Sequence, residues 1–405
     1  MYHRALPHAL ISLSAAFCVL TKVAQDPPIL RAAPPLPLRA LIVGGGPDLQ
    51  HNQVAIESNV RYVDRLLPAE TQRRILFADG SLDSRTVLYT DKKDHDLYRK
   101  TQIAKLDGPA RLENVRSEFS LLNKDLEQAP NRPVLLYFTG HGSPDDTPTY
   151  SNNRYDLWGD SELSVKELAN SIQALPHPGP IVLVMVECFS GAFSNVLFEK
   201  GNPNGELSDK PVCGFFASVA QRMAAGCTPN VNEADYRDFT GYFFAALTGT
   251  DRLGRPVKGA DYDHDGKVGM NEAFCYALLH DDSIDTPVCT SDAFLRRFVT
   301  VQETKVFEEK YSNVQKWAGP AQRAALDGLS AMLHYEGDDR LRRAYNDFGK
   351  IDMESESDDD VHLIRYVRLA KSVVLGHMLT TGTDEGLKKR FATLLAEESA
   401  NPMKP

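Results

Sequence analysis

The sequence predicts an α/β fold in which a mostly parallel sheet is flanked by helices, with a small all-helical region at the C-terminal end. Three observations lead to this prediction. Near-continuous apolar runs of strand length recur through the first three quarters of the chain, as buried parallel strands require. Amphipathic segments with helical spacing alternate with these runs. From about Val299 onward, the patterns are helical only.

The elements follow one another in a regular order. The 405 residues suit one large domain or two. The predicted strands share apolar and β-branched residues, and they cover residues 39–43, 73–78, 134–138, 181–186 and 213–219. The predicted helices share apolar positions three and four residues apart, and they cover residues 52–67, 111–126, 163–172 and 237–247. Residues 80–110 are polar throughout and are predicted to be an irregular surface insertion.

Two of the predicted strands each lead to a side chain that is useful in catalysis. Residues 134–138 lead to His141, and residues 181–186 lead to Cys188. If the helix at 163–172 is the crossover between them, both side chains lie at the carboxyl edge of the sheet, where sites form in open α/β folds. A thiol nucleophile and its base need this proximity. The simpler interpretation is a small buried cysteine and an ordinary histidine, and the sequence alone leaves it open.

The residue types fit acyl transfer. A thiolate attacks a carbonyl carbon far better than a thiol does, and a neighbouring imidazole can take the thiol proton and later donate it to a leaving amine. Gly142 follows His141 and leaves its N–H unobstructed, and the N–H of Cys188 is the second candidate donor to an oxyanion. The predicted catalytic residues are therefore His141, Gly142 and Cys188.

The segments around these residues read FTGHGS and ECFSGAF, and the histidine and cysteine are 47 positions apart. The pair of motifs resembles the legumain-type family (asparaginyl endopeptidases, peptidase family C13) of caspase-like cysteine peptidases. The resemblance covers roughly residues 39–246. It implies a caspase-hemoglobinase fold, a Cys–His dyad that needs no third member, and a protein or peptide substrate. Relatives of this fold include transamidases, so acyl transfer to an amine is an alternative reaction.

The sequence departs from the family in the turn after the first strand. There the family has an asparagine that supports the histidine and an arginine that binds the substrate side chain. The nearest matches here are Gly46 and Gln50, so an asparaginyl preference is not predicted. Three polar residues of this turn are candidate substrate contacts, although loop polarity also explains them: Gln50, His51 and Asn52.

Two further candidates for substrate binding lie on the later strands. Glu187 directly precedes Cys188, whereas the family's glutamate lies two residues before its cysteine. A shift of one residue in a strand moves a side chain to the other face, so Glu187 is a weaker match. Ser218 ends the strand at 213–219, near the position of family pocket residues.

A second motif, DYDHDGKVGMNE, spans residues 261–272 and has the pattern of an EF-hand calcium loop. The predicted ligands of Ca²⁺ are four carboxylates and one backbone carbonyl, from Asp261, Asp263, Asp265, Glu272 and Lys267 respectively. The preceding segment is rich in glycine and proline, which predicts a single loop–helix unit. An acidic loop without a metal is the alternative. The Cys–His chemistry itself requires no cofactor.

The N-terminal segment predicts export. Residues 1–24 contain an apolar run of 12 residues, 9–20, which is too short to span a bilayer comfortably and suits a signal peptide. An uncleaved membrane anchor and an apolar helix of a cytosolic protein remain alternatives. Residues 25–38 are rich in proline and predict an extended linker. In an exported protein, Cys275 and Cys289 are candidates for a disulfide.

The predicted organisation is a catalytic domain at residues 39–298, which includes the calcium loop, and a helical domain at 299–405. Legumain-type zymogens carry a helical C-terminal prodomain, so intramolecular inhibition by this region is a hypothesis. The net charge of −10 argues against a general nucleic-acid binder. The leading prediction is an exported, calcium-binding, legumain-like cysteine endopeptidase. A non-catalytic, calcium-binding interaction module on a caspase-like scaffold is the alternative from another class.

Overall fold

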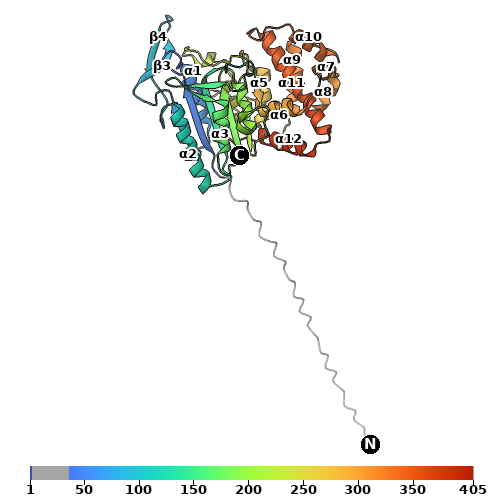
Figure 1. The fold of residues 1–405 in the computed structure, drawn as a ribbon, viewed down its shortest axis with the longest axis horizontal. Coiled ribbons are helices and arrows are strands. Elements are labelled where there is room, and N and C mark those ends of the chain that lie inside the picture. Colours follow the sequence, from blue (N-terminus) through green and yellow to red (C-terminus); the bar gives the residue numbers. More distant parts are fainter. Residues whose placement is uncertain (2–35, 405) are drawn as a thin grey trace. The chain divides into compact units, whose positions relative to one another are not determined.

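A mostly parallel sheet forms the centre of the chain (Figure 1). The structure, a computed structural model, describes Met1 and residues 36–404. The strands of the main path are β1 (Arg39–Gly45), β2 (Gln72–Phe77), β5 (Val134–Ser143), β8 (Ile181–Val186), β9 (Val212–Phe216) and β10 (Val288–Cys289). They are ordered β10-β9-β8-β5-β1-β2, and only β10 is antiparallel to its neighbour. This confirms the predicted α/β class.

The central strands are buried on both faces, as their unbroken apolar runs predict. In β8, alternate side chains enter two separate cores: Val182, Val184 and Val186 enter one, and Ile181, Leu183 and Met185 enter the other. The first core is covered by α1 (Val54–Leu66), α4 (Phe239–Thr248) and α5 (Met270–His280). The second is covered by α2 (Leu112–Gln128), α3 (Val165–Gln173) and the 3-10 helix η1 (Ser190–Leu197).

The pairing of β5 with β8 decides the position of the candidate site. The register runs from Val134 opposite Ile181 to Thr139 opposite Val186. His141 lies two residues beyond Thr139 and Cys188 two residues beyond Val186, the last pair between β5 and β8. The prediction that these two strands are adjacent and parallel is therefore confirmed.

Two polar segments contain strands that the sequence analysis did not predict. The stretch at 80–110 holds an antiparallel hairpin of β3 (Arg85–Thr90) and β4 (Asp96–Lys100). The Asp91 carboxylate accepts hydrogen bonds from two backbone N–H groups of the turn, which stabilises this polar hairpin. The loop after His141 holds β6 (Arg154–Leu157) and β7 (Ser161–Ser164), and β5 continues through His141 to pair with β6.

Seven helices complete the described chain after β10: α6 (Thr290–Phe298), α7 (Glu303–Phe307), α8 (Tyr311–Trp317), α9 (Pro320–Met332), α10 (Arg340–Phe348), α11 (Asp358–Thr381) and α12 (Glu385–Glu398). The all-helical pattern is confirmed. The chain from Leu36 onward nevertheless forms one compact unit. One continuous apolar core joins the sheet to α9 and α11, so the boundary predicted at residue 298 does not separate two cores.

Several predictions concern the N-terminus and the cysteines. The predicted signal segment, 1–24, and nearly all of the linker at 25–38 lie outside the described residues. Within residues 36–404, no helix is both long and apolar enough to cross a membrane. The five cysteines in that range are free thiols, so the disulfide considered between Cys275 and Cys289 is not formed.

Candidate active site

Cys188 lies at a sharp turn between β8 and η1. The next residue, Phe189, has φ 61° and ψ 15°, a left-handed conformation that is costly for a bulky side chain. Two hydrogen bonds hold it there: the Phe189 N–H donates to the Arg222 carbonyl at 2.8 Å, and the Asn153 side chain donates to the Phe189 carbonyl at 3.0 Å. The surrounding loops thus fix the direction in which Cys188 leaves the strand.

The Cys188 thiol is half-buried and rests against the backbone of Ala224. The Ala224 N–H donates to Sγ at 3.3 Å, and the S–H faces the Ala224 carbonyl oxygen at 3.7 Å. Burial raises the pKa of the Cys188 thiol. Because a free cysteine is already mostly protonated at neutral pH, the resting site contains a thiol and needs a base.

His141 has the properties of such a base. Its Nε2 lies 3.0 Å from Oε1 of Gln53, and its ring meets the His51 ring edge-on with centroids 5.5 Å apart. Burial and, second, the charge of His51 lower the pKa of His141. The imidazole is therefore neutral at neutral pH and can accept a proton.

Gly142 packs directly on the backbone of Cys188. A Cβ atom at position 142 would lie 2.4 Å from the Cys188 carbonyl oxygen and 2.8 Å from Cγ of Glu187. No side chain fits in that space, so the close approach requires glycine. The structure thus places all three predicted catalytic residues at one edge of the sheet.

Two of the predicted substrate contacts are buried and support loops instead. Asn52 is fully buried; its side chain accepts from the Gly46 N–H at 3.3 Å and donates to the Thr86 carbonyl at 2.9 Å. Ser218 is also fully buried, and its hydroxyl donates to the Met223 carbonyl at 3.0 Å. Neither side chain offers surface to a substrate, which corrects the prediction for both.

Glu187 is buried as well. Its side chain is 1% exposed, and within the described chain neither carboxylate oxygen has a hydrogen-bond partner. Burial raises its pKa well above the ordinary value and so favours the neutral acid. A neutral acid behind Gly142 does not contact substrate.

Only Gln50 and His51 of the predicted pocket residues are exposed. The His51 ring is fixed by its Nδ1, which lies 2.8 Å from Oδ1 of Asp48. That contact holds the His51 ring beside His141, where the charge of His51 lowers the pKa of His141.

Three residues of the site were not predicted. Gln53 contacts His141, one position beyond the polar residues that the sequence analysis selected. The Cys227 thiol donates to the Gly140 carbonyl at 3.4 Å, directly before His141. Asp285 is fully buried and accepts from the Ala225 N–H at 2.7 Å, next to the residue that contacts the Cys188 sulfur.

The C-terminal region also contributes, through α11. The Arg365 side chain is buried and donates to the carbonyls of Asp285 at 2.7 Å, Asp281 at 2.5 Å and Ser283 at 3.0 Å. Conversely, Arg222 lies in a loop beside Cys188, and its side chain donates to the Ser355 carbonyl of the helical region at 2.7 Å. Two arginines thus connect the site loops to the helical region.

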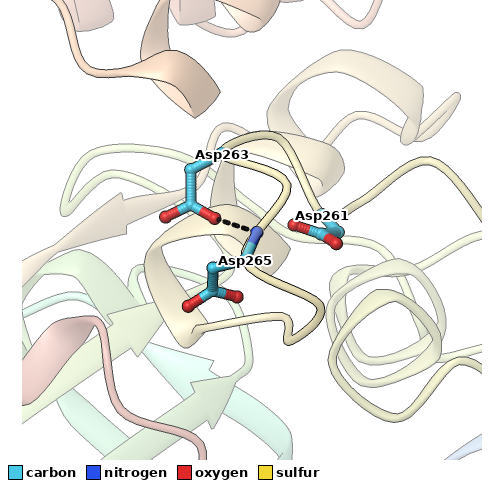
Figure 2. A group of neighbouring side chains, drawn as sticks. All are labelled: Asp261, Asp263 and Asp265. Atoms are coloured by element: carbon cyan, nitrogen blue, oxygen red, sulfur yellow. Dashed lines mark hydrogen bonds between the residues drawn. The ribbon is translucent and has the colours of Figure 1, made fainter.

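The second motif forms a compact acidic loop. Figure 2 shows Asp261, Asp263 and Asp265 as neighbours on one loop, and their ligand atoms lie within 4.8 Å of one another. The loop is shaped by hydrogen bonds from the Asp265 N–H to Asp263 and from the Gly266 N–H to Asp261, both 3.1 Å. Oδ1 of Asp261 is buried and has no partner within the described chain.

The other two predicted ligands differ from these three. Glu272 is not part of the group; its carboxylate accepts from the backbone N–H groups of Tyr262 at 2.7 Å and Gly269 at 2.9 Å. Lys267 follows Gly266 at the position from which a calcium loop offers a backbone carbonyl. Three of the five predicted ligands are therefore gathered.

The sequence matches no protein-family profile and no curated protein. Among solved structures, it is similar to a protein from Geobacter sulfurreducens, with 14% identity over 63% of this chain and 92% of the other and a TM-score of 0.36. It is also similar to a secreted C11 cysteine protease from Bacteroides thetaiotaomicron, with 13% identity over 68% and 71% of the chains and a TM-score of 0.29. The Drosophila initiator caspase Dronc shares 9% identity over 52% and 63% of the chains, with a TM-score of 0.28. Values this low carry no argument about activity.

Proposed function

We propose that the chain is a cysteine peptidase that hydrolyses peptide bonds in protein or peptide substrates. One observation carries this proposal: the β5–β8 register puts His141 and Cys188 equally far beyond the same edge of the sheet, with Gly142 packed on the Cys188 backbone. The motifs around these residues support a legumain-like enzyme. The exposed Gln50, at the position of the family's arginine, argues against an asparaginyl preference.

The reaction begins from a neutral pair. His141 takes the thiol proton as the Cys188 sulfur attacks the substrate carbonyl carbon, and the N–H groups of Gly142 and Cys188 stabilise the oxyanion. The imidazolium then donates its proton to the leaving amine, and an acyl-enzyme thioester remains. Water, deprotonated by His141, hydrolyses the thioester and restores the thiol. Gln53 is a positioning residue, because it acts by orienting the His141 ring.

Hydrolysis of a mixed peptide library tests this function. We expect cleavage by the wild-type chain and none by Cys188→Ala. Cys275→Ala is the matched control, since it removes a buried thiol on α5 outside the site and should remain active. Loss of cleavage in Cys227→Ala alone would transfer the role of nucleophile to the Cys227 thiol. The cleaved bonds define the residue preference.

Two alternatives have distinct outcomes in the same experiment. A non-catalytic interaction module predicts no cleavage by either protein and slow alkylation of Cys188, in keeping with its half-buried thiol. If the protein is a transamidase, an added primary amine should replace water as the acceptor, and the product should contain an amide bond between the acyl group and that amine. The peptidase proposal predicts rapid alkylation of Cys188 with a bell-shaped dependence on pH.

We also propose that the loop at 261–272 binds Ca²⁺. The convergence of Asp261, Asp263 and Asp265 and the unpartnered Oδ1 of Asp261 support it, because a hard cation would supply the missing partner. Glu272 would have to give up its backbone contacts to join them. Addition of Ca²⁺ to EDTA-treated protein should raise the melting temperature of the wild type but not of Asp263→Asn. The exposed Asp83→Asn is the control, and equal shifts in all three proteins would refute a site in this loop.

Export is a further proposal, supported by the apolar run at residues 9–20. N-terminal sequencing of the protein recovered from outside the cytoplasm tests it. A signal peptide predicts a new N-terminus near Ala16 or Ala24. An intact N-terminus in the membrane fraction indicates an anchor, and recovery only from the cytosol contradicts export.

A further inference from the structure

A cavity of about 640 Å³ is lined in part by residues of η1. It is separate from the calcium loop and has none of the catalytic residues in its lining. Its volume is in the range of small-molecule sites. Residues from five parts of the fold line it with polar and basic side chains: Ser151 before β6, Asn195 on η1, Gln221 before Ala224, Arg296 and Arg297 on α6, and Arg368 on α11.

The lining has an excess of positive charge. Three arginines face it, and Asp292 is the one acidic residue in the lining among the described residues. Asp292 is already engaged, since its Oδ1 lies 3.1 Å from Nη1 of Arg296 and also accepts from Ser372. The whole chain carries a net charge of −10, so the positive charge of this cavity is opposite in sign to that of the protein as a whole.

Arg368 is the least satisfied of the three arginines. Within residues 36–404 its guanidinium makes no hydrogen bond, and its Nε is buried without a partner. The nearest carboxylate oxygen, Oδ2 of Asp292, is 3.7 Å from Nη2. Burial and, second, the charge of Arg296 lower the pKa of Arg368 to about 10. The Arg368 side chain is 28% exposed and this long ion pair is its one charged contact within the described chain, so an anion in the cavity would supply the hydrogen-bond acceptors that the guanidinium lacks.

Arg297 faces the same cavity and has donors to spare. Its one hydrogen bond within the described chain runs from Nη2 to the Asn204 carbonyl at 3.1 Å. The planar guanidinium presents five N–H groups in a geometry that matches phosphate oxygens. Neutral polar groups complete the lining, which includes the hydroxyl of Ser151 and the amide of Asn195.

We propose that this cavity binds a small molecule with more than one phosphate group. Two arginines with free donors suit doubly charged oxygens, and the volume exceeds that of a single phosphate. The cavity adjoins the segment after His141 and the helix after Cys188, which are themselves joined by a hydrogen bond from Asn195 to the Ser151 carbonyl at 3.2 Å. Binding should therefore also reduce hydrogen exchange in both segments.

The test is calorimetric titration of pyrophosphate into the full chain carrying Cys188→Ala, after EDTA treatment and at constant ionic strength. The inactive background keeps the result independent of the proposed peptidase, and removal of calcium prevents its chelation by pyrophosphate. We expect one saturable site. Arg297→Gln and Arg368→Gln should each weaken it by roughly tenfold or more, as expected for loss of a charge-assisted contact. Arg342→Gln on α10, whose side chain is 61% exposed, is the matched control.

Each outcome decides the proposal. Unchanged affinity in both pocket variants, or no binding at millimolar pyrophosphate, overturns it. Binding of a glutamate-rich peptide in place of pyrophosphate also overturns it and indicates an acidic protein segment as the occupant. Arg297 is exposed and makes a single hydrogen bond within the described chain, so Arg297→Gln should fold normally and remains informative if Arg368→Gln does not.

Discussion

Replacement of Arg365 by methionine tests whether the helical region supports the candidate site. The Arg365 side chain on α11 donates to three carbonyls of the 281–285 segment at 3.0 Å or less, and to the Leu278 carbonyl at 3.4 Å. Asp285, in turn, accepts from the Ala225 N–H beside the residue that contacts the Cys188 sulfur. Methionine keeps the volume of the arginine stem and removes every donor.

The expected loss of stability follows from these contacts. A hydrogen bond from a charged donor contributes about 1.5–3 kcal/mol, but removal of the guanidinium also recovers its burial cost. The net decrease in the free energy of unfolding should be about 3–5 kcal/mol, as for other broken buried charge networks. At about 2 °C per kcal/mol for a chain of this size, the melting temperature should fall by about 6–10 °C.

The pH dependence of the same variant adds an independent check. Burial raises the pKa of Asp281 to about 6, and the charge of Arg365 opposes this rise. Without Arg365 the folded-state pKa rises further above the unfolded one, so ionisation of Asp281 costs the folded state more as pH increases. The stability deficit should be larger at pH 8 than at pH 5. Urea unfolding at both pH values, with Arg342→Met as the exposed control, measures it; a deficit below about 1 kcal/mol at both would refute the reasoning.

Three further predictions concern the site itself. His51→Gln removes a charge that lowers the pKa of His141, so the acid limb of kcat/KM against pH should move to higher pH; an unmoved limb contradicts the role of His51. Gly142→Ala forces a Cβ against the Cys188 carbonyl and should reduce kcat by roughly a hundredfold. Circular dichroism should show little change in fold, and a near-normal kcat would mean that the backbone can shift to accommodate the Cβ. Glu187→Gln should be more stable than the wild type by an amount that grows with pH, by about 1.4 kcal/mol per pH unit between the unfolded and folded pKa of Glu187, because the unfolded state releases this proton and the folded state keeps it. Parallel stability curves would mean that the folded-state pKa of Glu187 is not raised.

The parts of the site that the sequence predicted are those with local signals. Apolar runs locate β5 and β8. His141 and Cys188 follow these runs directly in the sequence, so they can be identified as candidates without any knowledge of the packing. Gln53 was missed by one position, because polarity in a turn does not show which side chain faces the histidine. Asp285 and Arg365 are 80 positions apart, and the periodic pattern of apolar residues does not show which carbonyl a distant guanidinium will bind. The hairpin of β3 and β4 was missed because β4 is polar and largely exposed, and because the apolar part of β3 around the buried Val87 and Leu88 is very short.

The helical region was predicted correctly as helical, and one apolar core joins it to the sheet, which bears on its function. An apolar stripe on a helix shows that the helix packs, but it does not identify the surface it packs on. Here α11 packs with α6 and α9, and Arg365 enters the sheet-bearing part of the chain. An inhibitory segment must be removable, whereas a buried arginine bound to backbone carbonyls of the site cannot leave without exposing them unpaired. These contacts therefore favour a supporting role for the helical region over the inhibitory role that the legumain-type resemblance implied.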